Sequence, residues 1–427
     1  MLYIRGTVST QKKERWAWCL LSFLFLLSYT FQVDARAETP LEGPDDIQAT
    51  EFGIENFLRK YWSRPLKTQG QPPADLSPVE TSLFPASCGT CHQSQFNDWR
   101  ESLHARSMGP GIMGQLVEMA ADAKDNRQNC IRCHAPLAEQ ANSLSRALGP
   151  PNSSPNDHEK PLYEQGLVCA ACHLREYRWY GPPQQAGRRI PDRTRLPHNG
   201  WSRQTAFEDS RFCSACHQFD ANGFELNGKL LENTFNEWQA SKFADGGVTC
   251  QSCHMPGRRH LWRGIHDPDM VRSGVTIKTM PLTVEKGFLS TALQMKNTAT
   301  GHFFPTYVTP KIIMQIYQQD AQGNLLPGSL KKHIVARKVP LDLSKEEFDT
   351  RIAPGKTAIL VYRTRLHKKA HSLIFQIKVE PDEFYTRFYQ ALLEMDLSED
   401  GRQRIEQAHK NSMDSEFILF ERRYLIK

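Results

Sequence analysis

The pentapeptide Cys-x-x-Cys-His occurs five times in this chain and constrains its fold more than any other feature. C-x-x-C-H is the attachment pattern of c-type haem: both thiols add to the vinyl groups of the porphyrin, and the adjacent histidine binds the iron from one face. Two intervening residues let one turn of backbone bring both sulfurs to the edge of the ring. The copies are Cys88–His92, Cys130–His134, Cys169–His173, Cys213–His217 and Cys250–His254.

Structural zinc is the alternative reading, because paired C-x-x-C sets also bind that metal. Zinc would not need a histidine directly after every second cysteine, so five complete copies favour haem. The sequence therefore predicts five covalent haem c groups with five proximal histidines. The predicted attachment residues are Cys88, Cys91, Cys130, Cys133, Cys169, Cys172, Cys213, Cys216, Cys250 and Cys253, and the proximal ligands are His92, His134, His173, His217 and His254.

The haem motifs also decide the fold class of the region around them. Five haems in about 167 residues leave few ordinary core residues for each, and the apolar content of the chain is modest, at 39%. We expect the macrocycles to act as the core, surrounded by a few short helices and irregular segments. Residues 87–273 are the predicted mostly α/irregular pentahaem domain, and we expect it to be largely unfolded without haem.

The N-terminus has the pattern of a secretory signal peptide. Basic residues precede an apolar run, Trp16–Val33, which ends at Ala35-Arg36-Ala37. This pattern predicts cleavage after Ala37, so that residues 1–37 are removed. The run is just long enough to span a bilayer, so an uncleaved membrane anchor stays open. The expected location is the periplasm or the extracellular surface, in agreement with haem attachment outside the cytoplasm. Cys19, the one cysteine outside the motifs, lies in this run.

The net charge gives no support for nucleic-acid binding. The formal charge is +6, but residues 1–37 contain five basic and two acidic residues. Ten haem propionates would bring the mature protein close to neutral or make it acidic, and the basic residues are scattered. Four arginines are better candidates for propionate partners, with a solvated surface as the alternative: Arg188, Arg189, Arg258 and Arg259.

The composition changes on both sides of the haem motifs. Residues 38–86 are rich in proline, glycine and charge, and they predict an extended lead-in with one short helix near Phe57–Trp62. Residues 274–427 contain runs rich in Val, Ile, Phe and Tyr, bounded by turn signals, and predict a β-sandwich-like domain. Its helical insertion is expected at Asp382–Met395 and around Gly401–His409. The expected strands are Val275–Met280, Phe288–Met295, Lys311–Tyr317, Ala358–Arg363, Leu373–Val379 and Glu416–Leu425.

A helix repeats within the haem region. Phe96-Asn97-Asp98-Trp99 matches Phe235-Asn236-Glu237-Trp238, and the serine and alanine that follow also match. His104 in the first copy corresponds to Phe243 in the second. The helix does not need that histidine, which favours a ligand role for His104.

The second ligand of each iron decides between a closed and an open site. A haem with two histidines is low-spin and suited to electron transfer, whereas an open iron can bind a substrate. His104 lies twelve residues after His92, about 18 Å along a helix, so it would serve a different haem. Methionine (Met108, Met113 or Met255) is the competing ligand, and the histidines beyond residue 330 are expected in surface or core roles. The candidate distal ligands are His104, His158, His198, His260, His266 and His302.

Several stretches resemble the multihaem cytochromes of the cytochrome c-552/c-554 group. They are Cys88–Ser107, Cys130–Leu137, Gly166–His173 and Phe235–Pro256, and Asn297–Thr306 resembles the join to a β-domain found in many members. The group includes the tetrahaem cytochrome that accepts electrons from hydroxylamine oxidoreductase. The resemblance implies that the histidine at 104 is a distal ligand. This chain departs from the tetrahaem pattern in its fifth motif and its long β-domain.

Three functions remain open from the sequence. The leading hypothesis is an exported electron carrier between a redox donor, such as a quinol-linked membrane protein, and a redox acceptor. The second is an enzyme acting on nitrite, nitric oxide or hydroxylamine at one open haem. Pentahaem nitrite reductases carry a lysine in the motif of the catalytic haem, which no copy has here, and we predict no catalytic residue. The third is a subunit of a polymeric cytochrome wire, which would make the protein a homo-oligomer.

Overall fold

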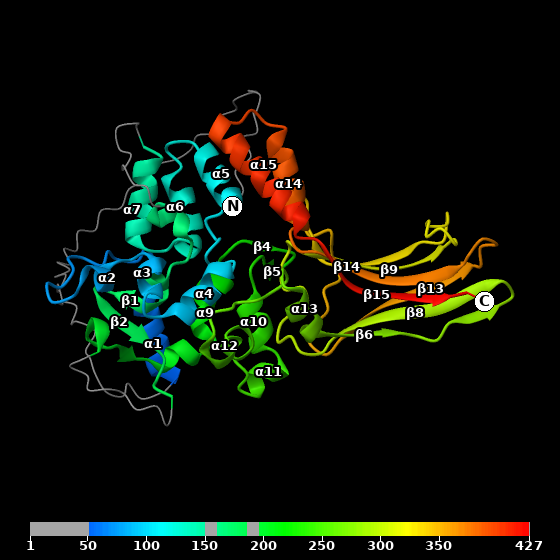
Figure 1. Ribbon diagram of the computed structural model, residues 1–427, viewed down its shortest axis with the longest axis horizontal. Coiled ribbons are helices and arrows are strands. Elements are labelled where there is room, and N and C mark those ends of the chain that lie inside the picture. Colours follow the sequence, from blue (N-terminus) through cyan, green and yellow to red (C-terminus); the bar gives the residue numbers. More distant parts are fainter. Residues whose placement is uncertain (1–50, 150–159, 186–195, 427) are drawn as a thin grey trace, which may run out of the picture.

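The computed structural model describes residues 51–149, 160–185 and 196–426 (Figure 1). Helices at one end are followed by two sheets that extend away from them. The expected signal peptide lies outside the described residues. No helix within the described ranges is long and apolar enough to cross a membrane.

The haem-motif region consists of short helices joined by loops, as the sequence predicts. Proline at the first turn starts several of them, because its fixed φ suits that position. The helices are α1 Glu51–Tyr61, α2 Pro78–Thr81, α3 Pro85–Gly89, α4 Gln93–Glu101, α5 Pro110–Glu118, α6 Lys124–His134, α7 Ala138–Ala147, α8 Cys169–His173, α9 Arg211–His217, α10 Thr234–Gln239, α11 Lys242–Asp245, α12 Cys250–His254 and α13 Pro268–Gly274, with 3-10 turns at Leu162–Gln165, Pro197–Asn199, Thr205–Glu208 and Pro256–Arg258.

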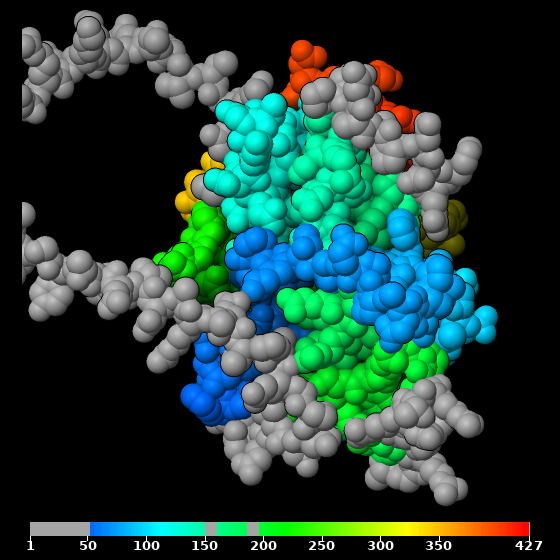
Figure 2. All heavy atoms as spheres, turned by 90° about the vertical axis from the view of Figure 1, so that its left-hand side faces the viewer, coloured from blue at the N-terminus to red at the C-terminus, as the bar shows by residue number. Residues whose placement is uncertain are grey.

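Small apolar clusters hold these helices together in place of one large core. The helix expected in the lead-in is α1, whose Phe57 and Tyr61 pack on Tyr180 and Ala206. Figure 2 looks at this end of the molecule, where early segments (blue and cyan) lie beside segments from the middle of the chain (green). Short strands complete the region: β1 Leu174–Arg175, β2 Arg178–Gly181, β3 Ser202–Arg203, β4 Glu225–Leu226 and β5 Lys229–Leu230.

Two four-stranded antiparallel sheets and a two-stranded one, β11-β12, form the C-terminal part within the described residues. One four-stranded sheet has the order β10-β9-β14-β15, and the other has the order β13-β8-β6 with β7 also pairing with β8. Each expected strand is present, so the prediction of a β-rich C-terminal region is confirmed. The bounds are β6 Val275–Thr279, β7 Thr283–Glu285, β8 Phe288–Asn297, β9 Lys311–Gln319, β10 Lys331–Val335, β11 Arg337–Lys338, β12 Phe348–Asp349, β13 Thr357–Arg365, β14 Ser372–Glu380 and β15 Phe417–Leu425.

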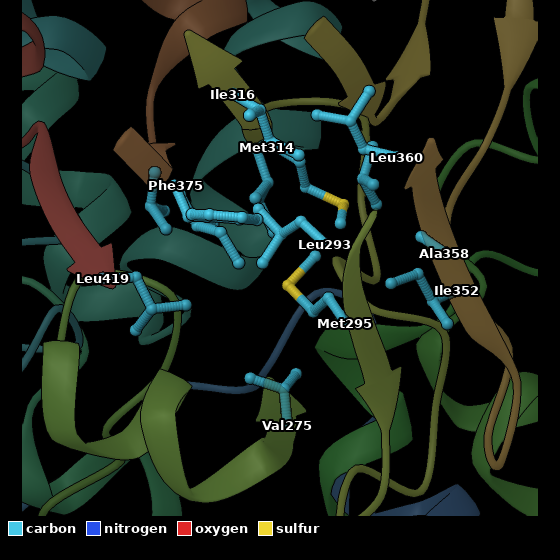
Figure 3. Close-up of a cluster of buried hydrophobic side chains, with 14 of the residues drawn as sticks. Val275, Leu293, Met295, Met314, Ile316, Ile352, Ala358, Leu360, Phe375 and Leu419 are labelled. Atoms are coloured by element: carbon cyan, nitrogen blue, oxygen red, sulfur yellow. The ribbon is translucent and has the colours of Figure 1, made fainter. Parts of the chain in front are cut away.

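The two sheets enclose one hydrophobic core. Strands β8 and β9 alternate between buried and partly exposed residues, so that one face of each sheet is apolar. Leu293 from β8, Met314 from β9, Leu360 from β13 and Phe375 from β14 meet between the sheets (Figure 3). This core needs no haem.

The helical insertion lies on the haem-motif region and not on the sheets alone. Its helices are α14 Glu383–Leu393 and α15 Glu399–Asp414, and α15 packs along α5 (Figure 1). The close approach depends on a residue without a side chain, because a Cβ at Gly114 would lie 2.7 Å from Cδ1 of Ile405. The insertion therefore connects the sheets to the second haem motif through α5 and α6.

Candidate haem sites and their axial histidines

Each haem motif lies at a helical turn that places its histidine next to its cysteines. In the first motif the amide of His92 donates to the carbonyl of Cys88 at 2.9 Å, one helical turn earlier. The other four motifs lie at the end of α6, in α8, at the end of α9 and in α12. No disulfide joins any of the ten motif cysteines. The motifs thus have the local geometry that haem attachment needs.

Six histidines share a hydrogen-bond pattern typical of metal ligands. A ligating histidine usually donates its second ring N–H to a carbonyl or carboxylate, which fixes the tautomer and leaves the other nitrogen for the metal. Here Nδ1 lies next to a backbone carbonyl, so Nε2 is free to bind iron. The motif pairs are His134 with Ser107 (2.7 Å), His173 with Tyr180 (2.8 Å) and His254 with Arg263 (2.7 Å); the distal-candidate pairs are His198 with Gly200 (2.9 Å), His260 with Arg258 (3.1 Å) and His302 with Phe303 (2.8 Å).

Three motif histidines each face a histidine from another segment. The ring centres are 6.4 Å apart for His92 and His198, and 6.2 Å apart for each of the other two pairs, His173 with His260 and His217 with His104. An imidazole nitrogen lies about 2 Å from a bound metal and the ring centre about 1 Å further, so two histidines on one iron put their ring centres about 6 Å apart. The three spacings fit a haem iron between each pair.

Burial keeps these imidazoles in the form that binds iron. It lowers the pKa of His173 to about 4 and the pKa of His104 to about 3. Burial, and to a smaller extent the charge on His254, lowers the pKa of His302 to about 4. All three rings are therefore neutral at pH 7, as a metal-binding imidazole must be.

The remaining predicted distal candidates are placed differently. His158 lies outside the described residues. Nε2 of His266 lies 2.9 Å from a carboxylate oxygen of Asp382, and its buried Nδ1 has no hydrogen-bond partner. This ring therefore has the nitrogens in opposite roles, with Nδ1 available to a metal. Met108 and Met113 are buried in an apolar cluster with Leu116 of α5. Within the described residues no histidine ring faces His134 or His254 at the spacing of the three pairs.

The arginines expected near the propionates have carboxylate partners in the protein. Arg258 pairs with Glu208, and Arg259 forms a two-bond ion pair with Asp98, with both distances 2.6 Å. Arg188 and Arg189 lie outside the described residues. No sequence pattern predicted the contact of Arg259 with Asp98.

Sequence reasoning missed Trp262, which lies between two candidate distal ligands. Its ring centre is 4.7 Å from that of His104 and 5.0 Å from that of His260. Its φ of 41° is unusual for a bulky residue. The sole sequence signal was a tryptophan between two candidate histidines, His260 and His266.

Comparisons with known proteins support the resemblance. Residues 87–154 match the model of a family described as cytochrome c554 and c-prime. Over this stretch the chain is similar to the multihaem c-type cytochromes of the cytochrome c-552/c-554 group. The resemblance predicted from the sequence is therefore confirmed, and it supports haem c as the cofactor and electron transfer as the general role.

A solved structure shows the same fold. It is described as a penta-heme cytochrome c552 from Thermochromatium tepidum, and the match has a TM-score of 0.55 at 17% identity, covering 82% of this chain and 100% of that chain. A comparison with curated proteins gives no match. The structural likeness extends well beyond the stretch that the family model matches, and it shows a shared fold over 82% of this chain.

Proposed function

We propose that this cytochrome is an exported pentahaem electron carrier, which passes electrons between redox partners through a close-packed array of five haem c groups. The three histidine pairs with ring centres 6.2–6.4 Å apart carry this proposal. Two imidazoles close both faces of an iron, which favours electron exchange over substrate binding. When bound, each haem would supply one electron by changing between ferric and ferrous iron.

The distal histidines tie distant parts of the chain together. His198 faces the first motif, His260 faces the third, and His104 faces the fourth. Each pair would connect two segments through one iron, so that haem binding contributes directly to folding. For His158, which lies outside the described residues, a role at the haem of His134 remains our proposal.

The cysteines indicate the order of the haems. Cys88 of the first motif lies beside Cys169 of the third, Cys213 of the fourth lies beside Cys250 of the fifth, and Cys133 of the second lies beside Cys216 of the fourth. Cys172 of the third motif is also close to the fourth. We propose a connected array in which the third motif joins the first to the fourth, and the fourth branches to the second and fifth.

The rest of the chain has roles that fit an exported carrier. We propose that residues 1–37 are a signal peptide, residues 38–86 a lead-in, residues 87–273 the pentahaem domain and residues 274–427 the β-domain. Location in the periplasm or on the cell surface would expose the array to a redox donor, such as a quinol-linked protein, and to an acceptor. The β-domain would dock a partner or cap the array.

Intact mass and rapid-mixing kinetics test this function. The mature protein should have the mass of residues 38–427 plus five haems. After full reduction, mixing with an oxidised small c-type cytochrome should reoxidise all five haems without added substrate. A mass with fewer than five haems, or one haem that stays reduced, would contradict a connected five-haem carrier.

A second candidate function is catalysis at the haem of the second motif. Within the described residues no imidazole faces His134, and tyrosines of the C-terminal part lie near its cysteines: Tyr307 near Cys133 and Tyr385 near Cys130. An open iron beside phenol groups could bind a small nitrogen oxide. Turnover of nitrite, nitric oxide or hydroxylamine by the reduced or oxidised protein would favour this function, and absence of turnover with all three would exclude those substrates.

A third candidate, a polymeric wire, has a simple test. Light scattering of the purified protein should give one defined small particle for the carrier. An elongated multimer would support the wire.

A further inference from the structure

The two copies of the repeated helix make matching contacts with haem motifs. In α4 the indole N–H of Trp99 donates to the carbonyl of Leu167 at 2.8 Å. In α10 the indole N–H of Trp238 donates to the carbonyl of Val248 at 2.9 Å. Each accepting carbonyl belongs to the residue two positions before the first cysteine of a motif, the third motif for α4 and the fifth for α10. Each tryptophan thus fixes the entry of the chain into one motif.

Asp98, which precedes Trp99 in α4, holds the candidate distal ligand His260 in place. Asp98 accepts a hydrogen bond from the backbone amide of His260 at 3.0 Å and two from the guanidinium of Arg259. The ring of His260 is the one that faces His173 of the third motif. Helix α4 therefore holds both sides of one candidate iron site, the motif through Trp99 and the distal ligand through Asp98.

The second copy makes the same kind of contact beside His302. Glu237 accepts from the backbone amide of Phe303 at 3.1 Å, while the carbonyl of His302 accepts from Nδ2 of Asn297 at 2.9 Å. These two groups belong to the same peptide unit, so its orientation is fixed from both ends. The direction of the His302 ring follows from that peptide, and its Nδ1 is held by the carbonyl of Phe303.

An arginine completes the second copy as it does the first. Arg351 donates to Glu237 at 2.8 Å and to the carbonyl of Thr306 at 2.7 Å. The side chains of Arg351 and Glu237 are 3% and 5% exposed, so neither charge has water as an alternative partner. The loop also passes close to the helix, because a Cβ at Gly301 would lie 2.9 Å from Trp238. The distal segment is therefore locked onto α10.

We propose that each copy of this helix is a positioning unit that sets both axial histidines of one haem. Asp98 and Trp99 would position His260 and His173, and Glu237 and Trp238 would position His302 and His254. The inference rests on the proposed haem-binding function and extends it, since it assigns His302 to the haem of the fifth motif. It also gives the β-domain a role, because Arg351 and His302 lie beyond residue 274.

Spectroscopy of holoprotein variants tests the second unit. In E237Q the charge opposite Arg351 is lost, so the His302 segment should detach and leave one iron high-spin. Carbon monoxide binding to the reduced protein should rise by about one per molecule relative to wild type, since an open ferrous haem binds this ligand. H302A should change the same haem, and the double variant H302A/E237Q should add nothing further.

E346Q is the matched control. Glu346 is also 5% exposed and paired with a buried arginine, Arg337, but it contacts no distal-histidine segment. E346Q should lower stability without changing the spin state. A change in spin state with E346Q, or none with E237Q, would overturn the positioning role. If H302A itself leaves every haem low-spin, the ligand assignment in the proposed function fails instead.

D98N tests the first unit at a site where folding is less at risk, because the side chain of Arg259 is 57% exposed. It should open the haem of the third motif, as H260A should. An unchanged spectrum for D98N beside an altered one for H260A would refute the positioning role of α4.

Discussion

At the scale of single residues, the sequence predicts one axial histidine of each candidate iron site but does not pair it with a second. The proximal histidines follow from their place beside the cysteines. The distal histidines come from segments far away in the chain, as when His104 faces His217 of the fourth motif. The exclusion of His92 as its partner assumed one continuous helix, but α4 ends at Glu101. The folded chain was needed to choose among the candidate irons. Asp98 and Trp262 had no signal beyond residue type.

Replacing His104 by methionine tests the pairing with the fourth motif. A thioether ligand raises the potential of a haem relative to imidazole, so H104M should raise the reduction potential of one haem, by on the order of 0.1 V or more. Spectroelectrochemical titration measures this shift. H333M, on β10, serves as the control and should leave all five potentials unchanged. If no haem changes its reduction potential in H104M, His104 is not a ligand.

At the scale of elements, strands and their burial were predictable, and the docking of helices was not. Alternating apolar residues in β8 and β9 marked the buried face of each strand directly. Helices α14 and α15 were expected inside the β-domain. The spacing of their apolar residues did not indicate that α5 packs against them. The glycines of α5, Gly111 and Gly114, were the missed signal for a close helix contact.

Substitution of Gly114 tests the contact between α5 and α15. A valine there would collide with Ile405 and should lower the free energy of unfolding by about 1–3 kcal/mol through overpacking. Denaturant unfolding of the holoprotein measures the loss. The control is G264A, where a Cβ meets nothing within 4 Å, with an expected change within about 0.5 kcal/mol. Equal stability of G114V and wild type would contradict this packing.

The ion-pair network between β5 and β12 predicts a pH dependence. Burial opposes the shift, but hydrogen bonds from Arg351 and Lys229 lower the pKa of Asp349 to about 2. The pKa of an aspartate in an unfolded chain is about 4. The stabilisation by the ion pairs of Asp349 is therefore complete above that pH and is lost as the pH falls toward about 2. The difference in unfolding free energy between wild type and D349N should shrink over this range. A difference that stays constant down to pH 2 would contradict the pairing.

At the scale of the whole molecule, two different sources of stability are joined in one chain. The sheets have their own hydrophobic core, whereas the haem-motif region has small clusters. We expect bound haem to supply the rest of its stability. The two parts meet through the buried ion pair of Arg351 with Glu237 and through hydrogen bonds from Arg337 to backbone carbonyls of β4 and β5. Helices α14 and α15 on α5 form a further contact. Cysteine spacing and strand patterns indicated both parts. The contacts between them depend on residues far apart in sequence, which composition does not encode.

The central claim is that the haem array is closed, and the spin state of its irons tests this most directly. Electron paramagnetic resonance of the oxidised, mass-verified protein should show low-spin iron at every haem, because two imidazoles give that state. The reduced protein should then bind no carbon monoxide. A high-spin signal from about one haem in five that also binds carbon monoxide would contradict the closed array. That result would favour catalysis at the haem of His134 over electron transfer as the function of the protein.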